Sequence, residues 1–195
     1  MQIQSIAQCG LTYVKDPYDA ERYEQLRSLA AEMLSYQTEL PIETVKGLFC
    51  NESGYQTPKL DTRAAVFKNE RILLVQEKDG LWALPGGWVD VLQSIGSNTV
   101  KEVKEEAGLD VKPLKIIALQ DKNLHNPPPR PYSICKVFVL CECLGGSFVA
   151  NSETLAMGYF SLQQLPPLAA EKTNREQLEM CFKAAASPCW EPLFD

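Results

Sequence analysis

Apolar residues recur at steps of three and four through the first 50 positions, which is the spacing of one face of an α-helix. Ile3 and Ile6 share such a face, and Gly10 is placed where a first helix would end. A second helix is predicted between Pro17 and Pro41. The pattern also allows a short third helix over 42–49. The N-terminal quarter therefore predicts a small all-α domain.

The pattern changes to short apolar runs after residue 58. Polar and turn-forming residues occupy 51–58, and we place a domain boundary there, with one domain over 1–57 and a second over 58–195. Strands are predicted at 62–67, 71–76, 81–84, 114–119, 134–143 and 157–160, with a proline-rich loop at 125–131.

Two helices accompany these strands. One is predicted over 97–107, ending at Gly108, and the other begins at Thr173 and runs to about residue 186. Thr173 and Glu176 have the spacing of a capping box, in which each side chain bonds the other residue's backbone N–H. Strands interleaved with helices predict an α/β fold with a mixed sheet covered by helices.

Composition excludes several classes of protein. The 195 residues are 45% hydrophobic and 23% charged, as in ordinary globular proteins, and carry a formal net charge of −6. That charge argues against extended contact with nucleic acid, which requires many Lys and Arg side chains. No apolar run approaches the roughly 20 residues of a membrane-spanning helix. The N-terminus also lacks the basic and apolar regions of a secretory signal.

Cysteine and histidine usage narrows the chemistry further. The seven cysteines are scattered, odd in number and without a CxxC pair, so neither a disulfide framework nor a zinc cage is expected. A reducing, cytoplasmic setting follows from that usage. The single histidine, His125, cannot by itself build a His-rich metal site.

Three glutamates share one side of the helix predicted at 97–107. Glu102, Glu105 and Glu106 are spaced by three and four residues, so their carboxylates project together. Their mutual repulsion costs roughly 0.2–0.5 kcal/mol per pair and requires compensation. Solvent and a Lys101–Glu105 ion pair could supply it, as could a divalent cation such as Mg²⁺, which prefers carboxylate oxygens.

The segment before this helix favours the cation. Leu84 to Val91 read Leu-Pro-Gly-Gly-Trp-Val-Asp-Val, a loop whose two glycines let backbone groups approach a ligand closely. With the helix, the segment resembles the Nudix box: Gly, five residues, Glu, seven residues, Arg-Glu, an apolar residue, any residue, Glu-Glu, any residue, Gly and an apolar residue. The matching positions are Gly87, Gln93, Lys101, Glu102, Val103, Glu105, Glu106, Gly108 and Leu109.

Two positions depart from the family pattern. Gln93 stands where Glu is usual and Lys101 stands where Arg is usual. In the family, these two side chains form an ion pair that braces the loop against the helix. Both members of the pair differ here, and we expect a Gln93–Lys101 hydrogen bond in place of the ion pair. The three glutamates are intact, so we interpret the departures as altered bracing.

The resemblance implies a Nudix α/β/α sandwich with a mixed sheet, preceded by a small helical domain. Residues 6–11, 16–23, 54–59 and 125–128 also resemble a bacterial subgroup that has such a domain and acts on nucleoside diphosphates linked to another moiety. The resemblance further implies that Glu102 and Glu106 are the main metal ligands. Glu105 would be a third ligand or a base, and the Gly86 carbonyl would complete the site around Mg²⁺ or Mn²⁺.

Four further residues are candidates for contact with substrate or water. Glu153 is the best-placed loop carboxylate for a general base, although an exposed loop glutamate is an equally good interpretation. Gly87 and Arg63 are candidate contacts to the substrate phosphates, and His125 is a candidate substrate ligand. Arg63 is otherwise an ordinary sheet-edge cation, and His125 a structural loop residue.

The predicted function is metal-dependent hydrolysis of a nucleoside diphosphate joined to a small group, such as ADP-ribose or CDP-choline. Two alternatives stay open: a nucleotide-sensing domain without hydrolysis, and a pyrophosphatase or exonuclease acting on RNA ends. We expect a homodimer formed through the N-terminal helices, because a domain of about 50 residues is marginally stable alone.

Overall fold

The computed structural model describes residues 2–50, 53–130 and 132–195. Residues 51 and 52 of the predicted linker and residue 131 of the predicted loop lie outside the described residues. The chain forms two compact units: an N-terminal unit up to residue 58 that includes 130–133, and a larger unit of 59–129 and 134–195.

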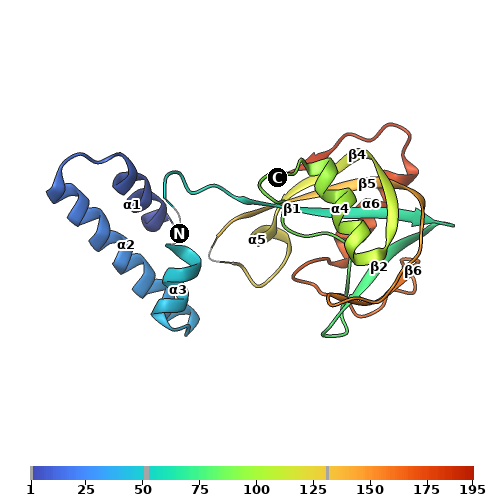
Figure 1. Ribbon diagram of the computed structural model, residues 1–195, viewed down its shortest axis with the longest axis horizontal. Helices are drawn as coiled ribbons and strands as arrows, with labels where there is room; N and C mark the ends of the chain where they lie inside the picture. Colours follow the sequence, from blue (N-terminus) through green and yellow to red (C-terminus); the bar gives the residue numbers. More distant parts are fainter. Residues whose placement is uncertain (1, 51–52, 131) are drawn as a thin grey trace. The chain divides into compact units, whose positions relative to one another are not determined.

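The N-terminal unit contains α1 (Gln2–Tyr13), α2 (Pro17–Thr38) and α3 (Ile42–Phe49) (Figure 1). Asp16 caps α2 because its side chain accepts hydrogen bonds from two backbone N–H groups of the first turn. A small core forms where buried Ala30 and Ala31 of α2 pack with Val45 of α3.

Gly10 does not end the first helix, as the sequence pattern predicted. Helix α1 continues to Tyr13, and a Cβ at position 10 would overlap the ring of Tyr23 on α2. Gly10 therefore permits close packing of α1 on α2, and the helix ends before the turn at Asp16.

The larger unit is built on a mixed sheet (Figure 1). Its described strands are β1 (Lys59–Lys68), β2 (Arg71–Glu77), β3 (Trp82–Ala83), β4 (Leu109–Asp121), β5 (Ile134–Gly146), β6 (Thr154–Phe160) and β7 (Leu193–Phe194). The strand order is β3-β2-β1-β5-β4-β7, and β6 pairs with β2. Strand β1 is antiparallel to β2 and parallel to β5. The β1–β2 hairpin turns at Asn69 and Glu70, both with positive φ, as in a two-residue hairpin loop.

Helices cover the two faces of this sheet. On one face, Val103 and Ala107 of α4 (Ile95–Ala107) pack on Val66 and Val139. On the other, Leu178 of α6 (Arg175–Ala186) packs in a core formed with other side chains of β1, β2 and β5. Successive residues of β1 alternate between the two cores, as strand geometry requires. The predicted α/β/α sandwich with a mixed sheet and a preceding helical region is confirmed.

Three details differ from the pattern-based prediction. The N-cap of α6 is Asn174, in a capping box with Gln177, so the predicted box at Thr173 is wrong by one residue. The short helix α5 (Lys122–His125) and strand β7 were not predicted, because elements of four and two residues show no periodicity. Among the described helices, none is long and apolar enough to cross a lipid bilayer.

Candidate active site

The loop from Leu84 to Val89 runs alongside β1 as an extra, irregular strand. Backbone N–H groups of β1 bond the carbonyls of Pro85 (2.8 Å) and Gly87 (2.9 Å), and Val89 donates back to Leu60 at 3.0 Å. Between the two bonded carbonyls lies Gly86, whose φ of 144° suits glycine, and where a Cβ would overlap the Thr62 carbonyl oxygen. The Gly86 carbonyl accepts no hydrogen bond from the described residues and is available to a ligand.

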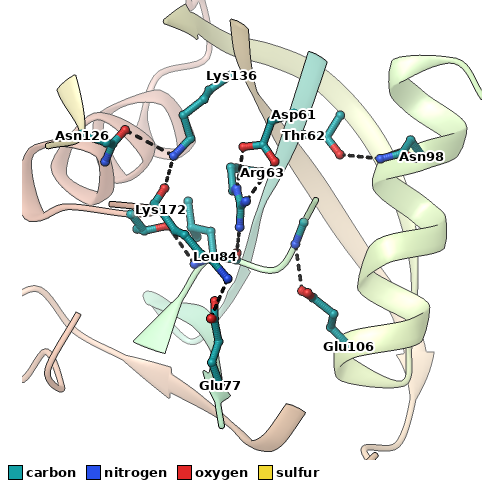
Figure 2. Close-up of polar contacts among 12 residues, drawn as sticks. Asp61, Thr62, Arg63, Glu77, Leu84, Asn98, Glu106, Asn126, Lys136 and Lys172 are labelled. Atoms are coloured by element: carbon teal, nitrogen blue, oxygen red, sulfur yellow. Dashed lines mark hydrogen bonds and ion pairs between the residues drawn. The ribbon is translucent and has the colours of Figure 1, made fainter. Parts of the chain in front are cut away.

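A buried ion pair supports this loop from the sheet (Figure 2). Arg63 donates two hydrogen bonds to the Asp61 carboxylate, both at 2.9 Å, and a third to the Leu84 carbonyl at 3.2 Å. Asp61 is 6% exposed and Arg63 is 7% exposed. The Leu84 N–H bonds the hydroxyl of Thr173 at 3.1 Å. The structure thus places Arg63 beneath the loop with its guanidinium engaged, and its contact with substrate stays a prediction.

Two of the three predicted glutamates face the glycine loop. The Glu106 carboxylate accepts a hydrogen bond from the Gly86 N–H at 2.9 Å (Figure 2). A Cβ on Gly87 would lie 2.9 Å from Oε2 of Glu102, so the absence of a side chain there leaves room for this carboxylate. Burial raises the pKa of Glu106 to about 7, although Gly86 and Arg63 oppose the shift. Burial likewise raises the pKa of Glu102, against the influence of Lys101.

Lys101 holds the third glutamate. Its ammonium lies 3.3 Å from Glu105, 3.5 Å from Glu102 and 3.0 Å from Asp90. The Lys101–Glu105 ion pair considered from the sequence is therefore present. The expected Gln93–Lys101 hydrogen bond is not: the Gln93 side chain forms no hydrogen bond with any described residue, and Lys101 bonds Asp90 instead.

A divalent cation, which the sequence motif implies, fits the donors that face the loop. No set of three His, Cys, Asp or Glu side chains in the described parts of the chain is arranged to hold a metal ion. Glu102 and Glu106 with the Gly86 carbonyl nevertheless offer hard oxygen donors, and Mg²⁺ typically takes one or two carboxylates and completes its shell with water and phosphate. The raised pKa values indicate that burial leaves these carboxylates short of compensating positive charge, which a cation would provide.

The loop that carries Glu153 is tied to the same helix. Asn151 donates from Nδ2 to the backbone carbonyl of Glu105 at 2.8 Å, and its Oδ1 accepts from the N–H groups of Glu153 and Thr154. The Glu153 carboxylate is exposed and has no hydrogen bond or ion pair with the residues that the structure describes. Asn151 thereby links the loop of the predicted base, Glu153, to α4, the helix that carries the box glutamates.

His125 has different neighbours. Its Nε2 lies 2.8 Å from Oδ1 of Asp195, and its carbonyl accepts a hydrogen bond from Asn174. Within the described chain, these contacts join α5 to Asp195, the residue after β7, and to the N-cap of α6. None of them links His125 to the box glutamates, and its substrate role stays a prediction.

A buried polar network lies beside the Asp61–Arg63 pair (Figure 2). Lys136 of β5 is 1% exposed and donates to Oδ1 of Asn126 at 3.2 Å and to the carbonyl of Lys172. The pKa of Lys136 is lowered to about 7, chiefly by burial and then by the Arg63 cation, against the attraction of Asp61. The Lys172 ammonium in turn bonds Glu77 at 2.6 Å.

Sequence reasoning missed the residues that support the site. Asn98, on α4, accepts a hydrogen bond from the Asp90 N–H at 3.3 Å and donates to the Thr62 hydroxyl at 2.9 Å. Asp61 and Asn151 were missed in the same way. The signal for Asp61 is its alternation with Arg63, which puts both side chains on one face of β1. The sequence around Asn98 and Asn151 contains no such signal for their roles.

Comparison with known protein families agrees with this geometry. Residues 58–181 match the NUDIX domain, and residues 1–49 match a UDP-X-like, N-terminal oligomerisation domain.

Individual proteins resemble most or all of the chain. A putative ADP-ribose pyrophosphatase, YjhB, of Bacillus subtilis is 43% identical over 195 residues, covering 100% of this chain and 94% of that protein. A crystal structure of an ADP-ribose pyrophosphatase from Streptococcus suis is 57% identical, with a TM-score of 0.68 over 71% of this chain and 100% of that one. A crystal structure of a UDP-X diphosphatase is 35% identical, with a TM-score of 0.67 over 98% of this chain and 94% of that one. With the NUDIX match over residues 58–181, and with Glu102 and Glu106 facing the glycine loop, the chain belongs to the Nudix hydrolase family.

Proposed function

We propose that the protein hydrolyses the pyrophosphate bond of a nucleoside diphosphate linked to a small moiety, with Mg²⁺ or Mn²⁺ as cofactor. The observation that carries the proposal is the pairing of two half-buried carboxylates, one helical turn apart, with the backbone of a glycine loop. Glu106 bonds the Gly86 N–H, and Glu102 occupies the space beside Gly87. Among substrates of this class we put ADP-ribose first, because two of the similar proteins are described as ADP-ribose pyrophosphatases.

The chain's own groups divide the work of such a reaction. Glu102, Glu106 and the Gly86 carbonyl would hold the metal, while the Gly87 backbone would orient the diphosphate. A divalent cation bound there would supply Lewis acidity and activate water for attack. Glu153, whose carboxylate has no ion pair or hydrogen bond in the described chain, accepts the proton of the attacking water, and Glu105 is the second candidate for this role. A water oxygen–phosphorus bond forms as the bridging phosphorus–oxygen bond breaks, leaving a nucleoside monophosphate and a phosphorylated small moiety.

A panel of substrates tests the proposal. ADP-ribose, CDP-choline, a UDP-linked sugar and a short triphosphorylated RNA are each incubated with Mg²⁺ or Mn²⁺, and the products are measured by chromatography. We expect turnover of at least one of the three nucleotide conjugates, with both products phosphorylated. Cleavage of the RNA alone would contradict the substrate class, and absence of all turnover would contradict hydrolysis.

The variant Glu106→Gln tests the assigned roles. Removing an outer-sphere partner of a metal site costs about 10–100-fold in activity, so loss of a ligand should reduce kcat by about 100-fold or more. Circular dichroism should stay that of the wild type, because the amide keeps the size of the side chain and can still accept the Gly86 N–H. Glu142→Gln, a charge-matched change at an exposed position of β5, is the control. Near-wild-type kcat in Glu106→Gln would remove Glu106 from the mechanism.

We further propose that the N-terminal unit joins two copies of the chain in a homodimer. Tyr18, Leu29, Met33 and Tyr36 lie within one stripe of α2, and each is more than half exposed. Such an exposed apolar stripe is typical of a protein–protein contact surface. Met33→Glu should shift the mass measured by light scattering from two chains to one, whereas Lys15→Glu, outside the helices, should leave it unchanged. A monomeric wild type would contradict the dimer.

The state of the cysteines supports a cytoplasmic location. All seven are free thiols in the structure, and the described chain contains no disulfide. Burial raises the pKa of Cys141 to about 12 and raises that of Cys181 as well, which keeps both thiols protonated and unreactive. Unpaired thiols of this kind are usual in a reducing compartment.

A further inference from the structure

We infer that Asp90 replaces, in this chain, the glutamate that the family pattern places at position 93, and that it positions the box glutamates through Lys101. The inference rests on the proposed function, since it concerns the same metal site. It assigns a positioning role to a residue that is not part of the Nudix motif.

The contacts of Lys101 carry the inference. Its ammonium lies closest to Asp90, at 3.0 Å, and slightly farther from Glu105 and Glu102, at 3.3 and 3.5 Å. One cation thus joins a carboxylate of the loop to two carboxylates of the helix. Lys101 is partly shielded, with its side chain 34% exposed, and the Glu102 side chain is 12% exposed. The ammonium is therefore held beside Glu102, one of the two proposed metal ligands.

A second contact fixes Asp90 independently of its charge. Its backbone N–H donates to Oδ1 of Asn98 at 3.3 Å, and Asn98 also bonds the Thr62 hydroxyl of β1. Asn98, Lys101 and Glu105 are spaced by three and four residues, so they lie along one face of α4. Asp90 contacts that face twice. Its backbone N–H bonds Asn98 in one turn of the helix, and its carboxylate pairs with Lys101 in the next turn.

The residue at the usual position, Gln93, carries no charge and does not take this role. The Gln93 N–H closes a tight turn on the Asp90 carbonyl at 2.9 Å. Val91 and Leu92, at the tip of the turn, are 96% and 93% exposed. The Gln93 side chain forms no hydrogen bond with the described residues. The loop therefore presents the carboxylate at its first turn residue, three positions earlier than the family pattern does.

The ion pair affects the metal ligands through competition for Lys101. While Asp90 bonds the Lys101 ammonium, the positive charge of the ammonium is shared among the carboxylates of Asp90, Glu102 and Glu105. Without Asp90, the ammonium is free to move fully onto Glu102 and Glu105, where it competes with a divalent cation. Such outer-sphere changes cost about 10–100-fold in metal affinity or activity. An exposed ion pair contributes little to folding stability, so the effect should appear at the metal and not in the melting temperature.

The experiment measures Mn²⁺ binding to the substrate-free protein by electron paramagnetic resonance, together with the metal dependence of kcat. Asp90→Asn should weaken Mn²⁺ binding about 10-fold and raise the half-saturating metal concentration by a similar factor. Its melting temperature in a chelator should stay within about 4 °C of the wild type. Gln93→Ala should match the wild type in every measurement. Asp90→Asn/Gln93→Glu, which restores the carboxylate of the family pattern, should recover most of the lost affinity.

Three results would overturn the inference: wild-type Mn²⁺ affinity in Asp90→Asn, an equal loss of affinity in Gln93→Ala, or no recovery in the double variant. Glu142→Gln controls for the loss of one negative charge elsewhere on the unit. Because Mn²⁺ binding is read without substrate, failure of the inference is distinguishable from failure of the proposed hydrolysis. A wild-type protein that binds Mn²⁺ but cleaves no nucleotide contradicts only the latter.

Discussion

Replacing Arg63 with Met separates a structural role for this residue from a role in substrate binding. The substitution preserves much of the side-chain volume but leaves the Asp61 carboxylate, 6% exposed, buried without its partner. It also removes the donor to the Leu84 carbonyl. Loss of one member of a buried ion pair costs about 3–5 kcal/mol, a large part of the roughly 5–15 kcal/mol that stabilises a typical protein.

For a chain of this size, each 1 kcal/mol lowers the melting temperature by about 2–4 °C, so Arg63→Met should melt roughly 6–20 °C below the wild type. Urea titration followed by tryptophan fluorescence measures the free energy directly. All three tryptophans lie beyond residue 80, so the signal reports on the larger unit. The double variant Asp61→Leu/Arg63→Met removes both charges and should lose only about 1–3 kcal/mol, the cost of the unbonded Leu84 carbonyl.

The result that would refute this reasoning is a stable but inactive single variant. If Arg63→Met melts within about 2 °C of the wild type and shows a raised KM, the guanidinium contributes to substrate binding and not to the support of the loop. Equal destabilisation of the single and double variants would also contradict the argument, because it would remove the unpaired Asp61 as the cause.

Two further predictions concern the loop and the buried network. Gly87→Ala puts a Cβ 2.9 Å from Oε2 of Glu102 and should lower Mn²⁺ affinity and kcat by about 10–100-fold. The control is Gly47→Ala, where a Cβ meets nothing within 4 Å. Equal activities of the two variants would contradict the close approach of Gly87 to Glu102. Lys136, surrounded by the charges of Asp61, Arg63, Lys122 and Lys172, has its pKa lowered from 10.5 to about 7. The unfolded chain therefore binds more protons than the folded protein between pH 7 and 10.5, so the free energy of unfolding should rise with pH across that range. Lys136→Met should flatten this rise in urea titrations at successive pH values, and parallel curves for the two proteins would contradict the lowered pKa.

Local patterns in the sequence predicted the elements that carry the site. The three- and four-residue spacing of Glu102, Glu105 and Glu106 is a property of any helix, so their shared side followed directly. Gly108 ended that helix as predicted, and the hairpin at 68–71 was marked by its polar turn. The box pattern identified the family because it spans the loop and the helix in one continuous segment.

The same local reasoning was wrong where a residue serves a distant partner. Gly10 was predicted to end α1, but it accommodates Tyr23 of the next helix. Thr173 was predicted to cap α6, but its hydroxyl accepts the N–H of Leu84, 89 residues away in the chain. In each case, a residue of a type that commonly ends or caps a helix instead contacts a residue outside that helix. A short window of sequence around the residue does not contain its partner.

The sequence by itself determined the family, the glycine loop and the three glutamates, because these depend on short-range spacing. Only the tertiary structure decided which groups hold them in place. It showed that Lys101 bonds Asp90 and not Gln93, that Arg63 lies beneath Leu84, and that Asn151 ties its loop to Glu105. These choices follow from the docking of the loops on β1 and α4, where a side chain's partner is set by the packing of segments far apart in the chain.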